Sequence, residues 1–241
     1  EGEWFSEKCR GILADLDEVM TGFSEQGELT GRIRITATND LGRQLIAPLI
    51  DAFMGEHPGL RVHLFLSDTV VDLVDAGFDV GIRTGPLRDS ELKARLLLRG
   101  RKCVCASPDY WKRRGKPQHP RELSDHNCLV LGSPDETQMS WSFRDGATRF
   151  RVRVAGDRTV NDGQALKDWA VAGAGVVMKS VFDVADDLAA GRLETALDAY
   201  NSEATNLYAV FPPRGHDSRR VRALLDYLSQ GLARSVSGTG N

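Results

Sequence analysis

The apolar residues of the first segment recur every three or four positions along the chain. They stand at Phe5, Cys9, Ile12, Leu16, Val19 and Phe23. This spacing is a heptad seam, and it predicts a helix that dimerises along one narrow stripe and leaves its charged face in water. A helix packed on its own domain is the alternative. Because the seam has fewer than three full heptads, we expect the end of a longer element, followed by a linker at residues 24–31.

A different pattern, in which apolar and polar residues alternate, begins at Arg32 and predicts a strand through Ala37. Helical spacing follows at 45–53, and the His-Pro-Gly sequence at 57–59 ends that helix. The elements predicted next are a strand at 60–66, a short helix at 70–75 and a third strand at 79–83. Strands and helices in alternation are typical of an α/β domain with a parallel sheet.

The middle of the chain contains a long extended run at 96–106, which Arg99, Gly100 and Arg101 interrupt. We interpret the interruption as a crossing between two lobes. Further strands are predicted at 128–131, 139–143, 148–154 and 207–211, and helices at 163–172, 180–190 and 218–232.

Composition narrows the class of protein. The chain has 241 residues, of which 41% are hydrophobic and 27% charged, so it is long enough for one large or two small cores. No apolar run approaches a bilayer span and no charged-then-apolar leader opens the sequence, so we expect a soluble, cytoplasmic protein without a membrane partner. The net charge of −3 offers no basic field for phosphates, and the chain alone should bind nucleic acid weakly.

The four cysteines, Cys9, Cys103, Cys105 and Cys128, form no Cys-x-x-Cys pair and no zinc-spaced set with histidine. Reduced thiols are therefore expected, and no metal. Cys103 and Cys105 lie two apart on a predicted strand and share a face. Small buried side chains are the favoured interpretation of this pair, with redox sensing as the alternative.

Catalytic motifs are missing from the sequence. Residues 173–175 form a Gly-Ala-Gly that ends a helix and precedes a strand, the reverse of a dinucleotide-binding loop. There is no nucleophile elbow, no Walker loop and no zinc-protease motif. The acidic residues Asp183, Asp186 and Asp187 are interpreted as a solvated helix face. Binding without chemistry is thus the favoured function class.

Together these pieces resemble the LysR-type transcriptional regulators from about Phe5 to Leu232. The motifs that carry the resemblance are CRGILADLDE at 9–18, GRIRITA at 31–37, VDLVDAGFDVGIRTG at 71–85, ASPDY at 106–110, AGAGV at 172–176 and DDLAAGRL at 186–193. Each motif alone is weak, but their order along the chain is specific. The sequence departs from the common family pattern in lacking a small hydroxyl residue near Asn39 and a proline after the glycine turn.

The resemblance implies a two-lobed α/β fold of the type 2 periplasmic-binding-protein kind, with two crossings between the lobes and a preceding linker helix. The implied parts are the linker at 1–30, lobe I at 31–101 with 212–235, and lobe II at 102–211. The resemblance also implies a homodimer or tetramer, with dimer contacts along the linker helix and a helix at 42–56. A winged helix-turn-helix that reads operator DNA would lie upstream of residue 1.

The resemblance further implies a small-molecule effector, a carboxylate or an amino acid among the candidates, between the lobes. Matching positions give the candidate contacts Thr38, Asn39, Asp40, Ser67, Arg83, Thr84, Asn161, Asp162 and Lys179. Arg83 could clamp a carboxylate, with a structural salt bridge as its alternative. For Asn39, Asp40, Asn161 and Asp162 the alternative is helix capping, and for Lys179 a solvated helix start. Because Asp40 and Asp162 would repel an anion, the charge of the effector stays open.

Two other functions share this fold. A stand-alone solute-binding protein of a transporter is the first, although the heptad helix before the first strand argues against it. An enzyme is the second, but it needs a nucleophile or an acid/base pair that the sequence does not offer. We therefore expect no catalytic residues and no cofactor, and a regulator whose effector changes the setting of its lobes and protomers.

Overall fold

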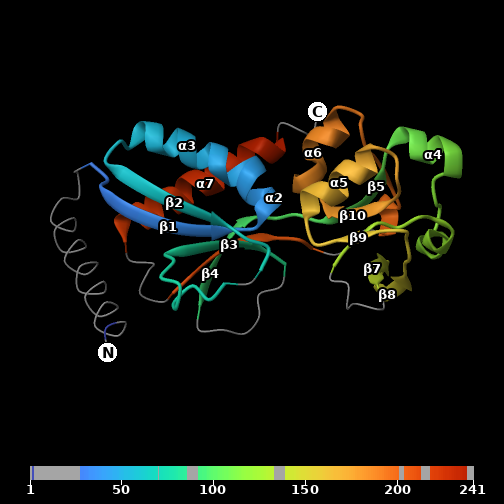
Figure 1. Cartoon of the computed structure of the whole chain (residues 1–241), viewed down its shortest axis with the longest axis horizontal. Coiled ribbons are helices and arrows are strands. Elements are labelled where there is room, and N and C mark those ends of the chain that lie inside the picture. The colour runs from blue at the N-terminus through green and yellow to red at the C-terminus, as the bar shows by residue number, and fades with distance from the viewer. Residues whose placement is uncertain are drawn as a thin grey trace.

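The structure is a computed structural model that describes residues 2, 28–69, 71–85, 92–132, 139–200, 204–212 and 218–237. Two α/β lobes lie side by side along the long axis of the molecule (Figure 1). The predicted dimerisation residues Phe5, Cys9, Ile12, Leu16, Val19 and Phe23 lie outside the described residues. None of the described helices is both long and apolar enough to cross a membrane.

The first lobe is built on a five-stranded sheet in the order β2-β1-β3-β12-β4. The strands are β1 (Gly31–Ala37), β2 (Leu60–Leu66), β3 (Val80–Thr84), β4 (Lys93–Leu98) and β12 (Leu207–Phe211). The central strand β1 pairs in parallel with β2 and β3, as the alternation of strands and helices predicts. Ile33 and Ile35 of β1 are fully buried, so the alternating pattern directs one side of this strand into the core.

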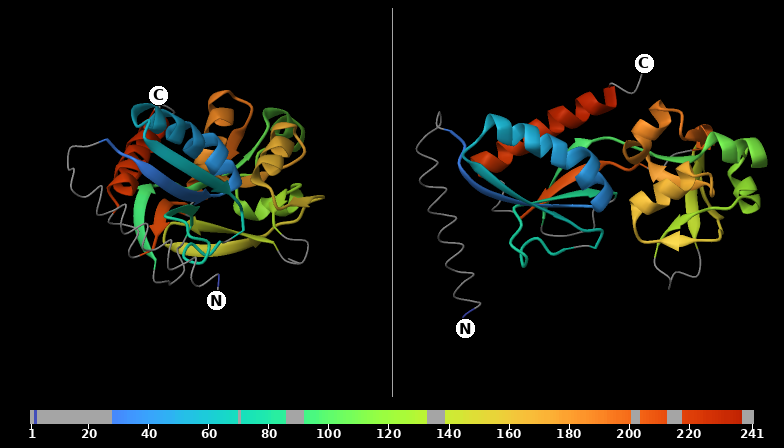
Figure 2. Two further views of the ribbon diagram at one scale, coloured as in Figure 1. Left: turned by 60° about the vertical axis from the view of Figure 1, so that its left-hand side comes forward. Right: turned by 45° about the horizontal axis from the view of Figure 1, so that its top comes forward.

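Helices cover one face of this sheet, where α3 and α7 lie side by side (Figures 1 and 2). The helical segments are α2 (Asn39–Leu41), the π-helical η1 (Gly42–Ile46), α3 (Ala47–Glu56) and α7 (Arg219–Ser237). The π-helical turn ends two residues before Pro48, which lacks the N–H that would bond four residues back. Buried leucines at 224, 225, 228 and 232 repeat every three or four residues along α7 and fill the core beneath it.

The predicted short helix at 70–75 is wrong over its described residues, which belong to a loop with a turn instead. Asp72 Oδ1 accepts hydrogen bonds from the N–H groups of Val74 (2.8 Å) and Asp75 (3.0 Å). An aspartate that binds nearby backbone N–H groups favours a turn over a helix. The turn closes when Phe78 N–H donates to the carbonyl of Leu73 (2.8 Å).

The described residues of the second lobe form three smaller sheets. Their strands are β5 (Lys102–Ala106), β10 (Val177–Ser180) and β11 (Glu194–Ala196) in the order β10-β5-β11, the pair β6 (Val130–Leu131) and β9 (Thr159–Val160), and the hairpin β7 (Ser140–Asp145) and β8 (Thr148–Arg153). The helices are α4 (Pro108–Arg114), η2 (Pro120–Asp125), α5 (Gly163–Val171), α6 (Val181–Ala189) and η3 (Asp198–Tyr200). Central strand β5 contributes Cys103 and Cys105 to one buried cluster and Val104 to another.

The lobes are joined by two passages of chain that touch each other. Arg101 forms an isolated bridge with Ala204, and Thr205 N–H donates to the carbonyl of Gly100 (2.8 Å). Gly100 has no room for a side chain, because the ring of Phe182 and the carbonyl of Thr205 occupy the place of a Cβ. We call residues 99–101 and 204–206 the crossing.

The position of β12 corrects the predicted end of the second lobe at residue 211. This strand pairs antiparallel with both β3 and β4, so residues 207–211 belong to the sheet of the first lobe. Tyr208 lies opposite Arg83 on one side and Leu96 on the other. The chain therefore returns to the first lobe before residue 207, because the strand must fill the place between β3 and β4.

Candidate functional site

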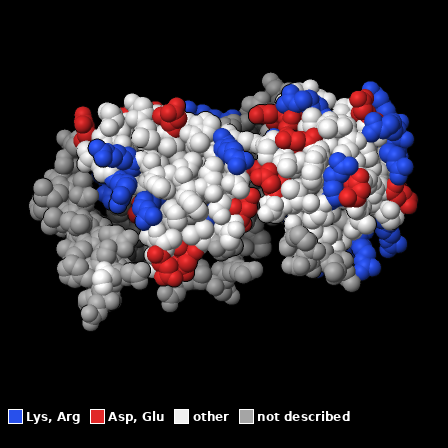
Figure 3. Space-filling model, viewed as in Figure 1, with Lys and Arg blue, Asp and Glu red and all other residues white. Residues whose placement is uncertain are grey.

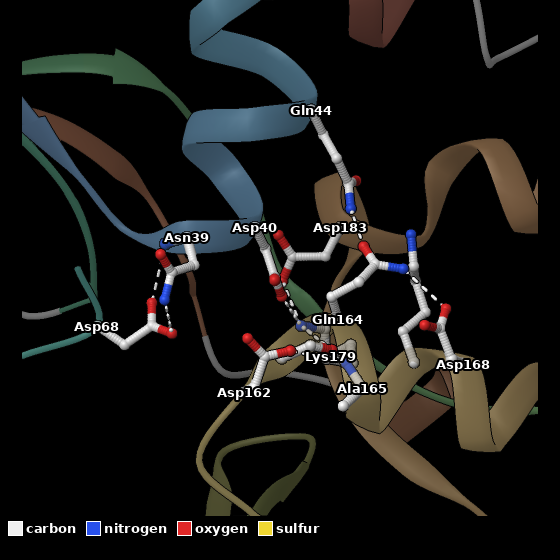
Figure 4. A network of polar contacts seen from close by, with 12 residues as sticks. Asn39, Asp40, Gln44, Asp68, Asp162, Gln164, Ala165, Asp168, Lys179 and Asp183 are labelled. Carbon is white, nitrogen blue, oxygen red and sulfur yellow. Dashed lines mark hydrogen bonds and ion pairs between the residues drawn. The ribbon is translucent and has the colours of Figure 1, made fainter. Parts of the chain in front are cut away.

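A buried ion pair connects the two lobes (Figure 4). Asp40, from α2 of the first lobe, accepts a hydrogen bond from Lys179 Nζ at the end of β10 in the second lobe (2.7 Å). The same Nζ lies 3.3 Å from Asp183 Oδ2 and 3.3 Å from the carbonyl of Gly163. The side chain of Lys179 is only 5% exposed. We call Asp40, Lys179 and Asp183 the interlobe cluster.

The interlobe cluster contains one more acid than base. Burial acts to lower the pKa of Lys179, but the nearby Asp183 and Asp40 outweigh it and the pKa is raised. Burial raises the pKa of Asp183, and the like charge of Asp40 adds to this effect against the opposing Lys179. Asp40 Oδ1 is buried without a hydrogen-bond partner. The cluster is therefore held together by a single ammonium group.

A second polar contact between the lobes lies beside the cluster (Figure 4). Gln44 Nε2 donates to Gln164 Oε1 (2.8 Å), and Gln164 Nε2 donates to Asp168 Oδ1 (2.8 Å). Gly163 begins α5 at this place, and a Cβ there would collide with the Asp40 carboxylate and the Lys179 ammonium. Glycine thus permits the close approach of the two lobes.

A cavity of about 830 Å³ lies against the crossing, next to the interlobe cluster. We group its lining residues by side chain: the polar wall is made of Thr84, Lys102, Ser140, Lys179, Ser180, Asp183 and Thr205, and the apolar wall of Leu129, Val130, Leu131, Met139, Trp141 and Met178. This volume is in the range of small-molecule sites in proteins, which are usually apolar with a few placed polar groups.

Two hydroxyls of the polar wall have no hydrogen-bond partner although they are buried. They are Ser180 Oγ and Thr205 Oγ1, and their residues are 6% and 5% exposed. Ser180 is the N-cap residue of α6, yet its side chain makes no capping hydrogen bond. A buried polar group without a partner costs about 1–3 kcal/mol, so an ordered water or another small buried partner is expected at each position.

Two of the predicted effector contacts, Thr84 and Lys179, line the cavity. Asp40 lies one hydrogen bond away, through Lys179. Asn39 instead pairs with Asp68, because its backbone N–H and its Nδ2 donate to the two carboxylate oxygens (2.9 and 2.8 Å). The structure therefore brings some of the predicted residues to one place and occupies others in contacts within the first lobe.

Arg83 and Ser67 also contact their own lobe. Arg83 Nη2 donates to Thr36 Oγ1 (3.0 Å), and burial lowers the pKa of its guanidinium while the nearby Asp68 opposes that shift. Ser67 Oγ accepts a hydrogen bond from Thr69 N–H (3.1 Å) and thereby forms a local turn.

The remaining predicted contacts lie at helix starts. Asp162 accepts a hydrogen bond from Ala165 N–H (2.8 Å) and so caps α5, which agrees with the capping alternative. Thr38 is the N-cap residue of α2 but makes no side-chain capping bond. Asn161 is exposed and directly precedes Asp162.

Two acidic residues of α6 contradict the prediction of a solvated face. Asp183 belongs to the interlobe cluster, and Asp187 is buried in ion pairs with Lys167 (3.3 Å) and Arg192 (2.7 Å). Asp186 is exposed as expected. The error has a physical reason: charged residues on a helix are usually solvated, and only partners distant in sequence reveal a buried pair.

Sequence reasoning missed Ser180, Thr205 and Lys102. The sequence pattern assigned Ser180 only as the first residue of a predicted helix at 180–190. Thr205 lies in the crossing and Lys102 directly follows its first passage, and the interruption at 99–101 was the sequence signal for this place. Sequence alone does not distinguish a satisfied hydroxyl from an unpaired one.

The surface charge agrees with the scattered charges of the sequence. On the face drawn in Figure 3, lysine and arginine gather at the outer end of the second lobe and do not form a band across both lobes. Among the described residues, no group of three or more His, Cys, Asp or Glu side chains is arranged to hold a metal ion.

The described cysteines are expected to be unreactive thiols. Cys103, Cys105 and Cys128 are fully buried and free. A hydrogen bond with Cys103 and burial raise the pKa of Cys105 well above its ordinary value, and burial raises the pKa of Cys128 to about 12. Alkylation at pH 7.5, read by peptide mass spectrometry, should leave all three unmodified until the protein is unfolded.

An exposed thiol is the control for this alkylation. Leu131→Cys places a thiol at a position that is 50% exposed, and it should react within the same time in the folded protein. Fast labelling of Cys103 or Cys105 in the native state would instead support redox sensing by this pair.

The raised pKa of Asp183 gives a pH dependence to stability. A carboxyl group whose pKa is higher in the folded chain binds more protons there, so its contribution to stability falls as pH rises through the raised pKa. Between pH 4 and pH 7, the wild type should therefore lose more unfolding free energy than Asp183→Asn, whose amide has no proton to release in this range. Urea unfolding measures the difference.

The matched control is Asp186→Asn, an exposed carboxyl on the same helix. Its pH profile should run parallel to that of the wild type. If Asp183→Asn also runs parallel, Asp183 is not buried beside Asp40 in solution.

Comparisons with known proteins agree with this architecture. Residues 26–233 match the family model of the LysR substrate binding domain. The chain is similar to the HTH-type transcriptional regulator DmlR of Escherichia coli (strain K12), with 32% identity over 97% of this chain and 76% of that protein. It is also similar to the HTH-type transcriptional activator TtdR of E. coli, with 33% identity over 83% of this chain and 64% of that protein.

The structural comparison gives the same result. The regulatory domain of CrgA, a LysR-type transcriptional regulator from Neisseria meningitidis, superposes with a TM-score of 0.74 at 30% identity, covering 84% of this chain and 98% of that domain. Two α/β lobes, a double crossing and a cavity beside it define a two-lobed ligand-binding domain of the type 2 periplasmic-binding-protein kind. The chain belongs to the LysR-type transcriptional regulators, and it comprises the effector-binding region of that family.

Proposed function

We propose that the chain senses a small molecule in the cavity beside the crossing and passes this signal to DNA-binding heads outside the described residues. The observation that carries the proposal is the cavity of about 830 Å³ at the junction of the lobes, which is lined by Lys179 of the ion pair with Asp40.

The signal would pass through the setting of the lobes. Lys179 lines the cavity and also holds Asp40 of the opposite lobe, so a ligand beside it changes a contact between lobes. Allostery of this kind requires that the effector bind one setting of the lobes more tightly than another.

The proposed effector contacts fall into two groups by their distance from the cavity. Thr84 and Lys179 line the cavity, and Asp40 is adjacent through its ion pair. Thr38, Asn39, Ser67 and Arg83 of the first lobe, and Asn161 and Asp162 of the second, do not line this cavity and would contact only a ligand that extends beyond it.

The wider assignment follows the relatives. We propose a cytoplasmic homodimer or tetramer that pairs through the heptad helix and α3, and a winged helix-turn-helix that binds operator DNA. The named relatives are transcriptional regulators, which disfavours both a stand-alone solute-binding protein and an enzyme.

A thermal-shift screen of the 241-residue chain against carboxylates, amino acids, aromatic acids, sugars and amines tests the proposal. One chemical class should raise the unfolding temperature saturably, because a ligand that binds only the folded state stabilises it. Leu131→Trp, which places an indole at the cavity, should abolish the rise.

The control variant is Val74→Trp, which adds the same side chain at a position that is 57% exposed and outside the cavity. Its response to the ligand should equal that of the wild type. A rise that survives in Leu131→Trp would place the ligand elsewhere and contradict the proposal.

A further inference from the structure

One face of the hairpin β7–β8, at the lower edge of the second lobe in Figure 1, is strongly basic. Every second residue of β8 from 149 to 153 is an arginine, and all three are exposed. Alternate residues of a strand share a face, and so do residues directly opposite each other on paired strands. We call this surface the arginine face, and it consists of Arg149, Arg151 and Arg153 on β8 and, opposite them, Arg144, Ser142 and Ser140 on β7.

The other face of the hairpin holds it on the lobe. Trp141, Phe143 and Val152 are buried there in a hydrophobic cluster of the second lobe. Asp145, the carboxylate of the hairpin, lies opposite Thr148 and belongs by this register to the same side. The arginine face is therefore turned outward, and its own residues include no acid.

The arginine face has no counterion among the residues that the structure describes. Its four arginines form no ion pair and no side-chain hydrogen bond with that part of the chain, and Arg144 Nε is buried without an acceptor. On α4 of the same lobe, by contrast, Arg113 and Arg114 donate to the carbonyls of Gly173 (2.9 Å) and Asp125 (2.8 Å). The hairpin arginines are thus free to bind an outside anion.

This arrangement does not help the hairpin to fold. Arg144 and Arg149 lie directly opposite each other, and like charges in that position destabilise a pair of strands. Residues that oppose folding without a local compensation are expected at functional sites. The arginine face is therefore better explained by a partner than by the fold.

The side chains of the arginine face favour the backbone of duplex DNA over other polyanions. Arginine and serine are common donors to phosphate oxygens. The face has no apolar or aromatic side chain, which the centre of a protein interface and a site for stacked single-stranded bases both use. Three arginines at alternate strand positions span about 13 Å, and one strand of DNA presents about four phosphates over that length.

We propose that the arginine face binds the phosphate backbone of duplex DNA, as a contact additional to the DNA-binding heads of the proposed function. The contact reads no sequence, because backbone contacts carry none directly. It is weak alone, since the whole chain has a net charge of −3. It gains strength when heads of the same protein already hold the DNA, because the second contact is then intramolecular.

Fluorescence anisotropy of a labelled duplex of arbitrary sequence tests this inference on the 241-residue chain. Binding should saturate at about 50 mM salt with a Kd of about 10⁻⁴ M or tighter, the range of non-specific DNA binding. The logarithm of the binding constant should fall against the logarithm of salt concentration with a slope of about −3, because each neutralised phosphate contributes about −0.9.

The test variant replaces the three β8 arginines together, as Arg149→Gln, Arg151→Gln and Arg153→Gln. Its Kd for the duplex should rise at least about tenfold at about 50 mM salt, and its salt slope should be smaller by about 2.7. Its Tm without DNA should equal or exceed that of the wild type, because like charges are removed from the hairpin. A lower Tm together with an unchanged Kd would assign these arginines to the fold and overturn the inference.

The control variant removes the same net charge from exposed positions of the first lobe, as Arg43→Gln, Arg61→Gln and Arg222→Gln. Its Kd should change by less than about threefold, because charges distant from the contact are screened. If the test and control variants lose DNA affinity equally, the arginine face is not the contact.

Sodium polyglutamate at the same charge concentration is the competing polyanion. It should bind the wild type more weakly than the duplex does. If it binds as tightly, and the test variant loses both, the face takes an acidic protein segment and the assignment to DNA is wrong. Absence of saturable duplex binding at about 50 mM salt also overturns the inference. None of these results concerns the cavity, so the thermal-shift screen decides the proposed function separately.

Discussion

Lys179→Met is expected to lower the unfolding free energy by about 3–5 kcal/mol, because it leaves Asp40 and Asp183 buried without their cation. For a protein of this size, that corresponds to a fall of roughly 10 °C in Tm. Methionine keeps most of the volume of the lysine stem, so the loss reports on the charge. Urea unfolding followed by circular dichroism measures it.

The matched control is Lys112→Met. Lys112 forms an ion pair with Asp109 on α4, where both side chains are more than three-quarters exposed, and its loss should change stability by less than about 1 kcal/mol. Adding Asp40→Asn and Asp183→Asn to Lys179→Met should restore part of the stability, since the buried negative charges are then gone. Equal effects of Lys179→Met and Lys112→Met would show that the interlobe cluster does not form in solution.

Gly100→Ala is expected to destabilise the protein by about 3 kcal/mol, which is large for the addition of one methyl group. The new Cβ would meet the ring of Phe182 and lie 2.9 Å from the carbonyl oxygen of Thr205. Because the second of these is backbone, the two passages of the crossing must move apart. Thermal and urea unfolding give the size of the effect.

Gly55→Ala provides the comparison for the same chemical change. Gly55 lies in α3 with open space around it, so alanine there should be neutral or stabilise by up to about 1 kcal/mol. The double variant Gly100→Ala with Phe182→Leu should recover only part of the loss, since the Thr205 carbonyl stays in place. A neutral Gly100→Ala would mean that the crossing is looser than the structure shows.

The alternating and helical patterns predicted most of the elements because burial alone decides them. The strand at 32–37 and the helix at 218–232 have regular apolar faces, and both are found, with α7 extending to residue 237. The helix at 70–75 failed because Asp72 binds nearby N–H groups, a local competition that apolar spacing does not register. The assignment of residues 207–211 to the second lobe was wrong because the sequence pattern does not show which strands a strand pairs with.

The candidate site was predictable in its location and less so in its residues. Strand ends and helix starts pointed to the junction of the lobes, and Thr84 and Lys179 do line the cavity. Asn39 does not line the cavity, because its side chain is hydrogen-bonded to Asp68, 29 residues away. Ser180 and Thr205 were missed because a sequence does not show that a hydroxyl lacks a hydrogen-bond partner. That requires the positions of all neighbouring atoms.

The crossing also limits how the lobes can move. Its two passages are joined by the hydrogen bond between Thr205 and Gly100 and by the bridge between Arg101 and Ala204, so they form a short two-stranded ribbon. Motions of the lobes that pull the two passages apart break these contacts, whereas motions that carry both passages together keep them. The lobes would then rotate about the crossing as a hinge. A molecule bound beside Ser180 and Thr205 would lie next to this hinge, where a small displacement produces a large one at the outer ends of the lobes.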